Sequence, residues 1–144
     1  MNSGDAVALL RGGAEPPPVL AGVRVLVVDD EPDIRELLSA ILAAYRADVR
    51  AVGSVHEALR AIDEGAPDVI VSDIGMPGHD GCDLIRAIRA REQGGGGRRI
   101  PAVAMTAFVG RRAREAAIEA GFDVYLGKLF EPFDLVAILH ELIA

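Results

Sequence analysis

The sequence predicts an α/β fold: a single doubly wound domain with a parallel sheet of five strands and helices on both of its faces. Two observations predict it. Short runs of Val, Ile and Leu alternate five times with amphipathic stretches along the 144 residues, and strands that alternate with helices imply parallel strands joined by right-handed crossovers. In addition, 51% of the residues are hydrophobic but only 4% are aromatic, and such an aliphatic composition suits a sheet covered by helices.

Length and charge narrow the possible classes of protein. A chain of 144 residues is typical of one domain that buries its core without a disulfide or a structural metal. The single cysteine, Cys82, excludes an internal disulfide and fits a reducing compartment. The net charge of −7 makes direct nucleic-acid binding a poor hypothesis. The apolar stretches are shorter than the roughly 20 residues that cross a bilayer, and no signal peptide is evident, so we expect a cytoplasmic protein without membrane association.

Residues 1–20 are expected to form a flexible leader or linker, and residues 21–144 to form the folded domain. The run Pro16-Pro17-Pro18 favours extended polyproline conformation and cannot join a strand ladder. The alternative is that the leader docks a partner.

The first half of the domain shows a regular alternation of strand and helix. Arg24–Val28 is a β-branched run typical of a central strand. Pro32 fits the first turn of a helix whose apolar residues recur at spacings of three and four. A second strand over residues 49–52 is followed by Ser54, a plausible N-cap with Glu57 completing a capping box. A third strand, residues 69–71, leads to an aspartate.

The second half continues the same alternation. We expect helices over residues 82–92 and 109–120 and from 132 onward, and strands over 102–105 and 124–126. The four glycines Gly94–Gly97 are interpreted as a loop, because a phosphate-binding loop would need Lys and Ser or Thr directly after it. The expected fold is flavodoxin-like with strand order 2-1-3-4-5, which places a crevice between the carboxyl ends of strands one and three.

Chemically active side chains follow the strands at that edge of the sheet. Asp29 and Asp30 end the first strand and Asp73 ends the third. Three carboxylates crowded together require a counter-charge, and Mg²⁺ prefers oxygen ligands of this kind. Thr106 ends the fourth strand and Lys128 follows the fifth, adding a hydroxyl donor and a cation. This set suits phosphoryl transfer onto a carboxylate.

Each of these residues also has an ordinary structural interpretation. The acids before Pro32 could cap a helix and complement its dipole. Asp73 could be a turn acid, Thr106 a strand-end hydroxyl and Lys128 a solvated charge. Their joint occurrence at the ends of four strands favours a functional site.

Four motifs, VLVVDDE, VSDIGMPGHDG, MTA and YLGK, occur in this order. With them, the chain from about Val23 to its end resembles the receiver domain of two-component response regulators, which has a chemotaxis-regulator-like fold. The resemblance implies that Asp73 accepts a phosphoryl group from a histidine kinase or a histidine phosphotransfer protein. It also implies that Mg²⁺ is bound directly by Asp30 and Asp73, largely through water by Asp29, and by the backbone carbonyl of Gly75.

The resemblance further assigns the groups that sense the phosphoryl group. Thr106 and Lys128 would contact its oxygens, and Tyr125 would be the switch aromatic that turns inward with Thr106; the alternative is a half-buried strand tyrosine. The readout would be the face formed by residues 109–120, residues 124–126 and the last helix, a face that could also form a homodimer. The domain would act as a signalling phosphoacceptor with limited self-catalysed phosphorylation and dephosphorylation, and its downstream target is not specified by the sequence.

One position departs from the family pattern. Leu129 follows Lys128 where the family usually has proline, often after a cis peptide bond. A non-proline cis bond costs about 2.5–4 kcal/mol, so the Lys128-Leu129 bond is either trans with a shifted loop or strained.

Three alternatives remain open at this stage. The chain could be a stand-alone receiver or the receiver of a hybrid histidine kinase, because residues 16–25 resemble the linker that precedes such receivers; we expect no effector domain after the last helix. It could be a degenerate receiver that only binds proteins. A small Mg²⁺-dependent aspartyl phosphatase is less favoured, because those enzymes usually carry a second acid two residues after the nucleophile, where this chain has Gly75.

Overall fold

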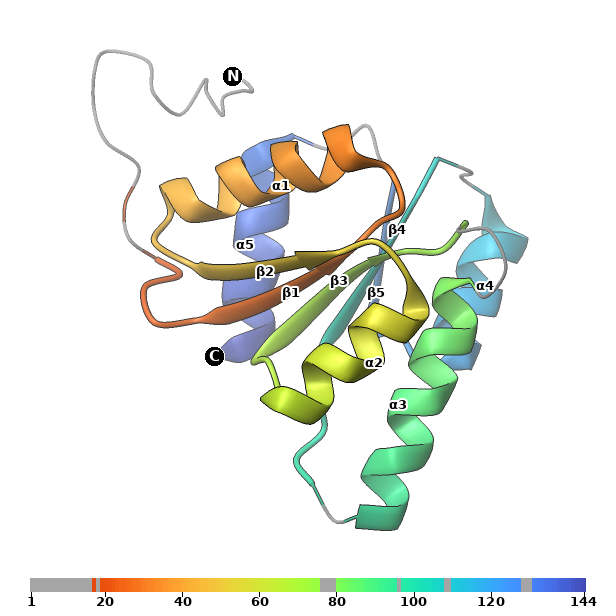
Figure 1. Ribbon diagram of the computed structural model, residues 1–144. Coiled ribbons are helices and arrows are strands. Elements are labelled where there is room, and N and C mark those ends of the chain that lie inside the picture. The colour runs from red at the N-terminus through yellow and green to blue at the C-terminus, as the bar shows by residue number, and fades with distance from the viewer. Residues whose placement is uncertain (1–16, 18, 76–79, 96, 108–109, 128–130) are drawn as a thin grey trace.

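The structure is a computed structural model and describes residues 17, 19–75, 80–95, 97–107, 110–127 and 131–144 (Figure 1). Within these residues, five strands alternate with five helices. The strands are β1 (Arg24–Val28), β2 (Asp48–Val52), β3 (Val69–Asp73), β4 (Ala102–Thr106) and β5 (Val124–Gly127). The helices are α1 (Pro32–Ala44), α2 (Val55–Glu64), α3 (Gly81–Gly95), α4 (Arg111–Ala120) and α5 (Pro132–Ile143).

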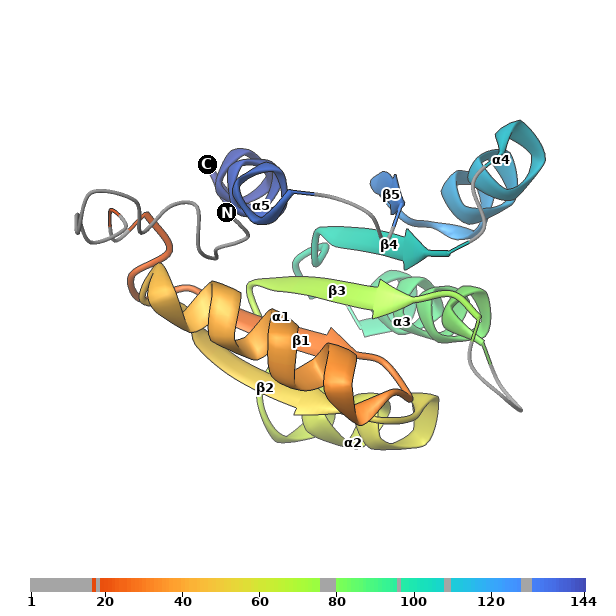
Figure 2. The same cartoon turned by 90° about the horizontal axis from the view of Figure 1, so that it is seen from above.

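The strands form one parallel sheet in the order β2-β1-β3-β4-β5, which confirms the predicted fold and strand order. Figure 2 shows β1 to β4 running in a common direction. The register places Val28 beside Ser72 and Asp73 beside Met105. The carboxyl ends of β1, β3 and β4 therefore meet at one edge of the sheet, where the sequence carries its acids.

Two apolar clusters pack against the two faces of the sheet. α1 and α5 cover one face, and α2, α3 and α4 cover the other (Figure 1). Alternate strand residues supply the two clusters, as the period of a strand requires; in β1, Val25 and Val27 face α1 and α5, whereas Leu26 and Val28 face the other helices. α4 contributes least, because Ala117 is its only buried residue.

Side-chain hydrogen bonds lie at the start of α2 and near the end of α3. The Ser54 hydroxyl accepts the N–H of Glu57 at 3.1 Å, as predicted for the N-cap of α2. The Glu57 carboxylate reaches one residue further than a capping box requires and accepts the N–H of Gly53 at 2.7 Å. The predicted end of α3 at Glu92 is wrong by three residues, since α3 continues to Gly95. Glycine disfavours helix, but a hydrogen bond from the Ile100 N–H to Glu92 fixes the last turns.

The packed domain reaches back into the expected leader. Leu20 is fully buried in the cluster on the α1–α5 face, and its N–H donates to the carbonyl of Tyr45 at 3.1 Å. Gly22 then turns the chain into β1 with a positive φ of 79°, a conformation that glycine adopts at little cost. Residues 1–16 and 18 of the expected leader lie outside the described residues.

Tyr45 supports a prediction about stability. Its side chain is fully buried beside Leu20, and no described residue forms a hydrogen bond with its hydroxyl. A buried hydroxyl without a partner contributes nothing to offset its desolvation. Tyr45→Phe is therefore expected to leave the free energy of unfolding unchanged or to raise it by up to about 1 kcal/mol, measured by urea unfolding at pH 7.

The same side chain predicts a dependence on alkaline pH. Burial raises the pKa of Tyr45 above its ordinary value, so the unfolded chain releases this proton first, near pH 10. The titration of Tyr45 therefore costs the fold no stability below about pH 10. It lowers the free energy of unfolding progressively as the pH rises toward the folded-state pKa. The wild type should therefore lose more stability above about pH 10 than Tyr45→Phe does. A Phe variant less stable by over about 1 kcal/mol at pH 7 would show that the hydroxyl is bonded.

Candidate functional site

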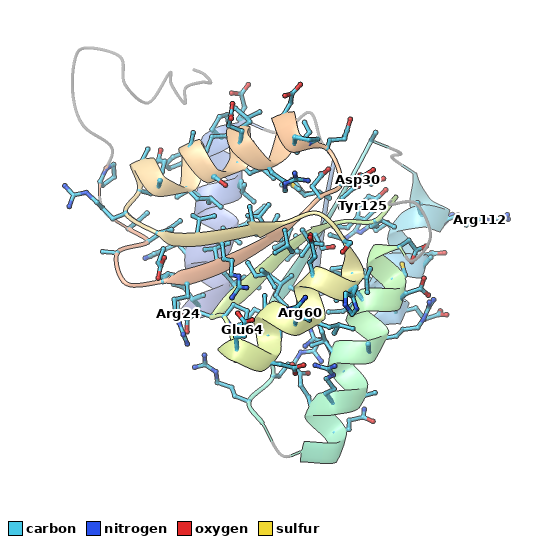
Figure 3. All side chains as sticks on the ribbon, in the orientation of Figure 1. Arg24, Asp30, Arg60, Glu64, Arg112 and Tyr125 are labelled. Carbon is cyan, nitrogen blue, oxygen red and sulfur yellow. The ribbon has the colours of Figure 1, made fainter. Side chains whose placement is uncertain are left out.

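The first two acids of the site lie in the turn between β1 and α1. The Asp29 N–H donates to the carbonyl of Val52 at 3.1 Å, which extends the pairing of β1 with β2 by one residue. The Asp29 carboxylate accepts the N–H of Glu31 at 2.9 Å, a local bond in which an aspartate side chain shapes its own turn. Pro32 occupies the first turn of α1, as predicted. Asp29 is buried and Asp30 is half-buried, and Asp30 lies at the carboxyl end of β1 in Figure 3.

The third acid, Asp73, ends β3 and is held on several sides. Its carboxylate accepts the N–H of Gly75 at 3.2 Å, and its backbone carbonyl accepts the Ser72 hydroxyl at 3.0 Å. The next residue, Ile74, donates its N–H to Met105 on β4 at 3.0 Å. Asp73 is only 4% exposed, so its carboxylate occupies a fixed and largely water-excluded position.

The three acids lie together at the edge of the sheet. One carboxylate oxygen from each of Asp29, Asp30 and Asp73 lies within 4.8 Å of the others. Three ionised carboxylates at this separation repel one another unless a cation lies between them. The donors are all oxygen, two of the residues are buried, and Mg²⁺ prefers such ligands. The residues present therefore fit a magnesium ion.

Thr106 and Tyr125 extend the site toward β4 and β5. Thr106 is 3% exposed and follows Met105, the β-sheet neighbour of Asp73. Strand alternation places Thr106 on the same face of the sheet as Ala104, and Tyr125, which is beside Ala104 in the register, packs on that face too. Tyr125 is half-buried. Lys128 and the Lys128-Leu129 bond lie outside the described residues.

Sequence reasoning missed two residues that shape the site. Arg35, one turn into α1, donates from Nη1 to the carbonyl of Asp29 at 2.8 Å. Gly81, the first residue of α3, packs so closely on the end of β3 that an added Cβ would overlap the carbonyl oxygen of Asp73. An arginine one turn after an acidic pair, and a glycine at a helix start, were the available signals for them.

Cys82 lies nearby but is not activated. Burial raises the pKa of its thiol, and the neighbouring Asp80 and Asp83 raise it further against the opposing effect of Arg86. A thiolate is the reactive form of cysteine, so this residue is a buried apolar contact of α3.

Residues 25–140 match the family model of the response regulator receiver domain. This chain is a response regulator receiver domain. Receiver domains are signalling phosphoacceptors, and the acid cluster at the carboxyl edge of the sheet fits that role.

Relatives of this receiver domain differ in length. The chain is 37% identical over 122 residues to an uncharacterized 14.6 kDa protein of Leptolyngbya boryana, covering 85% of this chain and 91% of that protein. It is 36% identical over 114 residues to the DNA-binding response regulator MtrA of Mycolicibacterium smegmatis, covering 79% of this chain but only 47% of MtrA. This receiver domain therefore spans about half the length of that regulator.

A solved receiver domain of known structure is also similar to this chain. It belongs to the sensor histidine kinase PA1611 of Pseudomonas aeruginosa PAO1 and carries a magnesium ion coordinated in its active-site cleft. It superimposes with a TM-score of 0.76 and 34% identity, over 85% of this chain and 98% of that one. None of the described helices of this receiver domain has both the length and the apolar character needed to span a membrane.

Proposed function

We propose that Asp73 is the residue of this receiver domain that accepts the phosphoryl group. The observation that carries the proposal is the gathering of Asp29, Asp30 and Asp73 within 4.8 Å at the carboxyl edge of the sheet. An oxygen of the Asp73 carboxylate forms the new bond to phosphorus. The phosphorus–nitrogen bond of a phosphohistidine breaks, its electron pair returns to the imidazole nitrogen, and that nitrogen takes up a proton. The donor is a histidine kinase or a histidine phosphotransfer protein.

The acid cluster would hold Mg²⁺ through the carboxylates of Asp29, Asp30 and Asp73 and the backbone carbonyl of Gly75. Bound Mg²⁺ offsets negative charge on the phosphoryl oxygens. The protein's own groups orient the reaction: the Gly75 N–H fixes the Asp73 carboxylate, and the burial of Asp73 limits access of water. Thr106 would donate its hydroxyl to a phosphoryl oxygen, and Lys128 would supply a second positive charge.

Phosphorylation would bias an existing equilibrium between two arrangements of Thr106 and Tyr125. Their common face of the sheet supports this role, because a shift of Thr106 toward the phosphoryl group leaves space that Tyr125 can enter. The readout would be the face formed by α4, β5 and α5, which could also form a homodimer. On α4, Ile118 is 42% exposed, and the Arg112 side chain points away from the body of the domain (Figure 3).

We further propose that the domain acts in the cytoplasm, either alone or as the receiver of a hybrid kinase. The solved relative from a sensor histidine kinase supports the hybrid-kinase possibility. The chemistry of this receiver domain would be limited to taking up the phosphoryl group and losing it by hydrolysis.

Incubation with acetyl phosphate and Mg²⁺ tests this function. Intact mass should show one added phosphoryl group on the wild type, and none on Asp73→Ala or when the metal is chelated. Asp63→Ala is the matched control, because Asp63 is an exposed acid on α2, and it should be phosphorylated as the wild type is. An adduct that survives Asp73→Ala would overturn the proposal, and repeated turnover of phosphoesters would indicate an enzyme instead.

A further inference from the structure

Arg35 of α1 contacts the peptide bond that joins two residues of the acid cluster, Asp29 and Asp30. Its Nη1 donates to the backbone carbonyl of Asp29 at 2.8 Å. That carbonyl belongs to the peptide bond between Asp29 and Asp30, so the hydrogen bond acts on both residues at once. A bond from a charged donor to a carbonyl is roughly twice as strong as one between neutral groups.

The other side of the guanidinium is closed by the loop after β2. A Cβ built on Gly53 would lie 2.9 Å from Nη1 of Arg35 and 3.5 Å from its Cζ. The same Cβ would lie 3.5 Å from Oε1 of Glu57, the atom that accepts the Gly53 N–H. The guanidinium therefore fits between the turn after β1 and the turn after β2 because residue 53 has no side chain.

We propose that Arg35 is a positioning residue for the metal site, which holds the Asp29–Asp30 peptide so that both carboxylates face Asp73. This inference rests on the proposed function, since it concerns the binding of Mg²⁺. Without the metal, the three carboxylates repel one another, and this repulsion favours movement of the turn after β1 away from β3. Arg35 opposes that movement through the backbone, and Gly53 keeps the guanidinium in place.

The direction of the effect on magnesium affinity separates positioning from simple charge. Removing a cation beside the acids would, through charge alone, strengthen the binding of Mg²⁺. Losing the group that orients the ligands weakens binding, and changes to such outer partners typically cost about 10–100-fold in metal affinity. Positioning therefore predicts a Kd that rises where charge predicts one that falls.

Two variants disturb the contact by different routes. Arg35→Met removes the donor and its charge. Gly53→Ala keeps the charge but displaces Nη1, at little cost to the fold because the displaced atom ends a flexible side chain. Arg60→Met is the matched control, because Arg60 is an exposed arginine that lines the same surface cavity as Arg35 and Gly53.

Calorimetric titration with Mg²⁺ measures the Kd of each variant, and thermal unfolding confirms that each is folded. We expect Arg35→Met to raise the Kd for Mg²⁺ by about tenfold or more. Gly53→Ala should also raise this Kd, and Arg60→Met should leave it unchanged. A folded Arg35→Met with an unchanged or lower Kd overturns the inference while the proposed function stands. If Arg35→Met does not fold, the Kd of Gly53→Ala decides in the same way. A wild type that binds no Mg²⁺ overturns the proposed function and this inference together.

Discussion

Gly81→Ala is expected to lower the free energy of unfolding by about 3 kcal/mol and to impair phosphorylation of Asp73. A methyl group on residue 81 would overlap the carbonyl oxygen of Asp73 and lie 2.9 Å from the Cα of Ile74. These are backbone atoms, which cannot rotate away as a side chain can. In addition, the Gly81 N–H donates to the Ile74 carbonyl at 2.9 Å, so the start of α3 and the end of β3 must separate or distort together.

Gly94→Ala is the matched control on the same helix. Apart from its two chain neighbours and the nearby backbone of α3, no atom of the described residues lies within 4 Å of a Cβ on Gly94. Alanine favours helix over glycine, so stability should be unchanged or rise by up to about 1 kcal/mol. Urea unfolding gives both free energies, and the rate of acetyl phosphate labelling reports the position of Asp73. If Gly81→Ala unfolds within about 0.5 kcal/mol of the wild type, a surface-like effect, the contact with β3 does not constrain residue 81.

Arg89→Met is expected to destabilise the domain by about 3 kcal/mol, because it removes the cation paired with the largely buried Glu92 and the donor to the Ile100 carbonyl. The Arg89 side chain is 11% exposed and pairs with Glu92 at 2.8 Å and with Asp123 at 3.2 Å. It also donates to the backbone carbonyls of Ile100 and Gly121. One side chain therefore joins α3 to the start of β4 and to the turn before β5, at the end of the sheet opposite the acid cluster.

Arg91→Met provides the control from the same helix. Arg91 pairs with Asp63 at 2.7 Å, but their side chains are 46% and 65% exposed, and exposed pairs contribute about 0–1 kcal/mol. The free energies of unfolding of the two variants, measured in urea, should thus differ by at least about 2 kcal/mol. Equal losses would show that burial does not distinguish these two arginines.

The positions of the strands could be predicted because their signals are local, and the strand order followed from the fold class. Each buried strand is a short aliphatic run, and each acid of the cluster ends a strand or comes just after one. The carboxyl ends of parallel strands meet at one edge, so topology alone brought Asp29, Asp30 and Asp73 together. The approach of Thr106 to that edge follows from the same reasoning.

The supporting contacts could not be predicted because they join residues distant in the sequence. Arg89 and Asp123 are separated by 34 positions, and Arg35 meets Gly53 only after β1 and β2 have paired. The sequence alone does not distinguish either arginine from the exposed arginines of α4. The predicted end of α3 was wrong for another reason: the Ile100 N–H bonds to the carboxylate of Glu92 from beyond the helix and holds an end that glycine propensity would release.

The weak anchoring of α4 determines which part of the domain can move at low cost. α1 buries Leu38, Ile41 and Leu42, whereas the ten residues of α4 bury only Ala117. Burial stabilises by about 0.8 kcal/mol per CH₂ group, so detaching α4 exposes far less apolar surface than detaching α1. Local opening of α4 therefore lies at the low end of the free-energy scale of partial unfolding. Of the five described helices, α4 is therefore the one that a change at the acid cluster would reposition most readily while the sheet and the other helices stay packed.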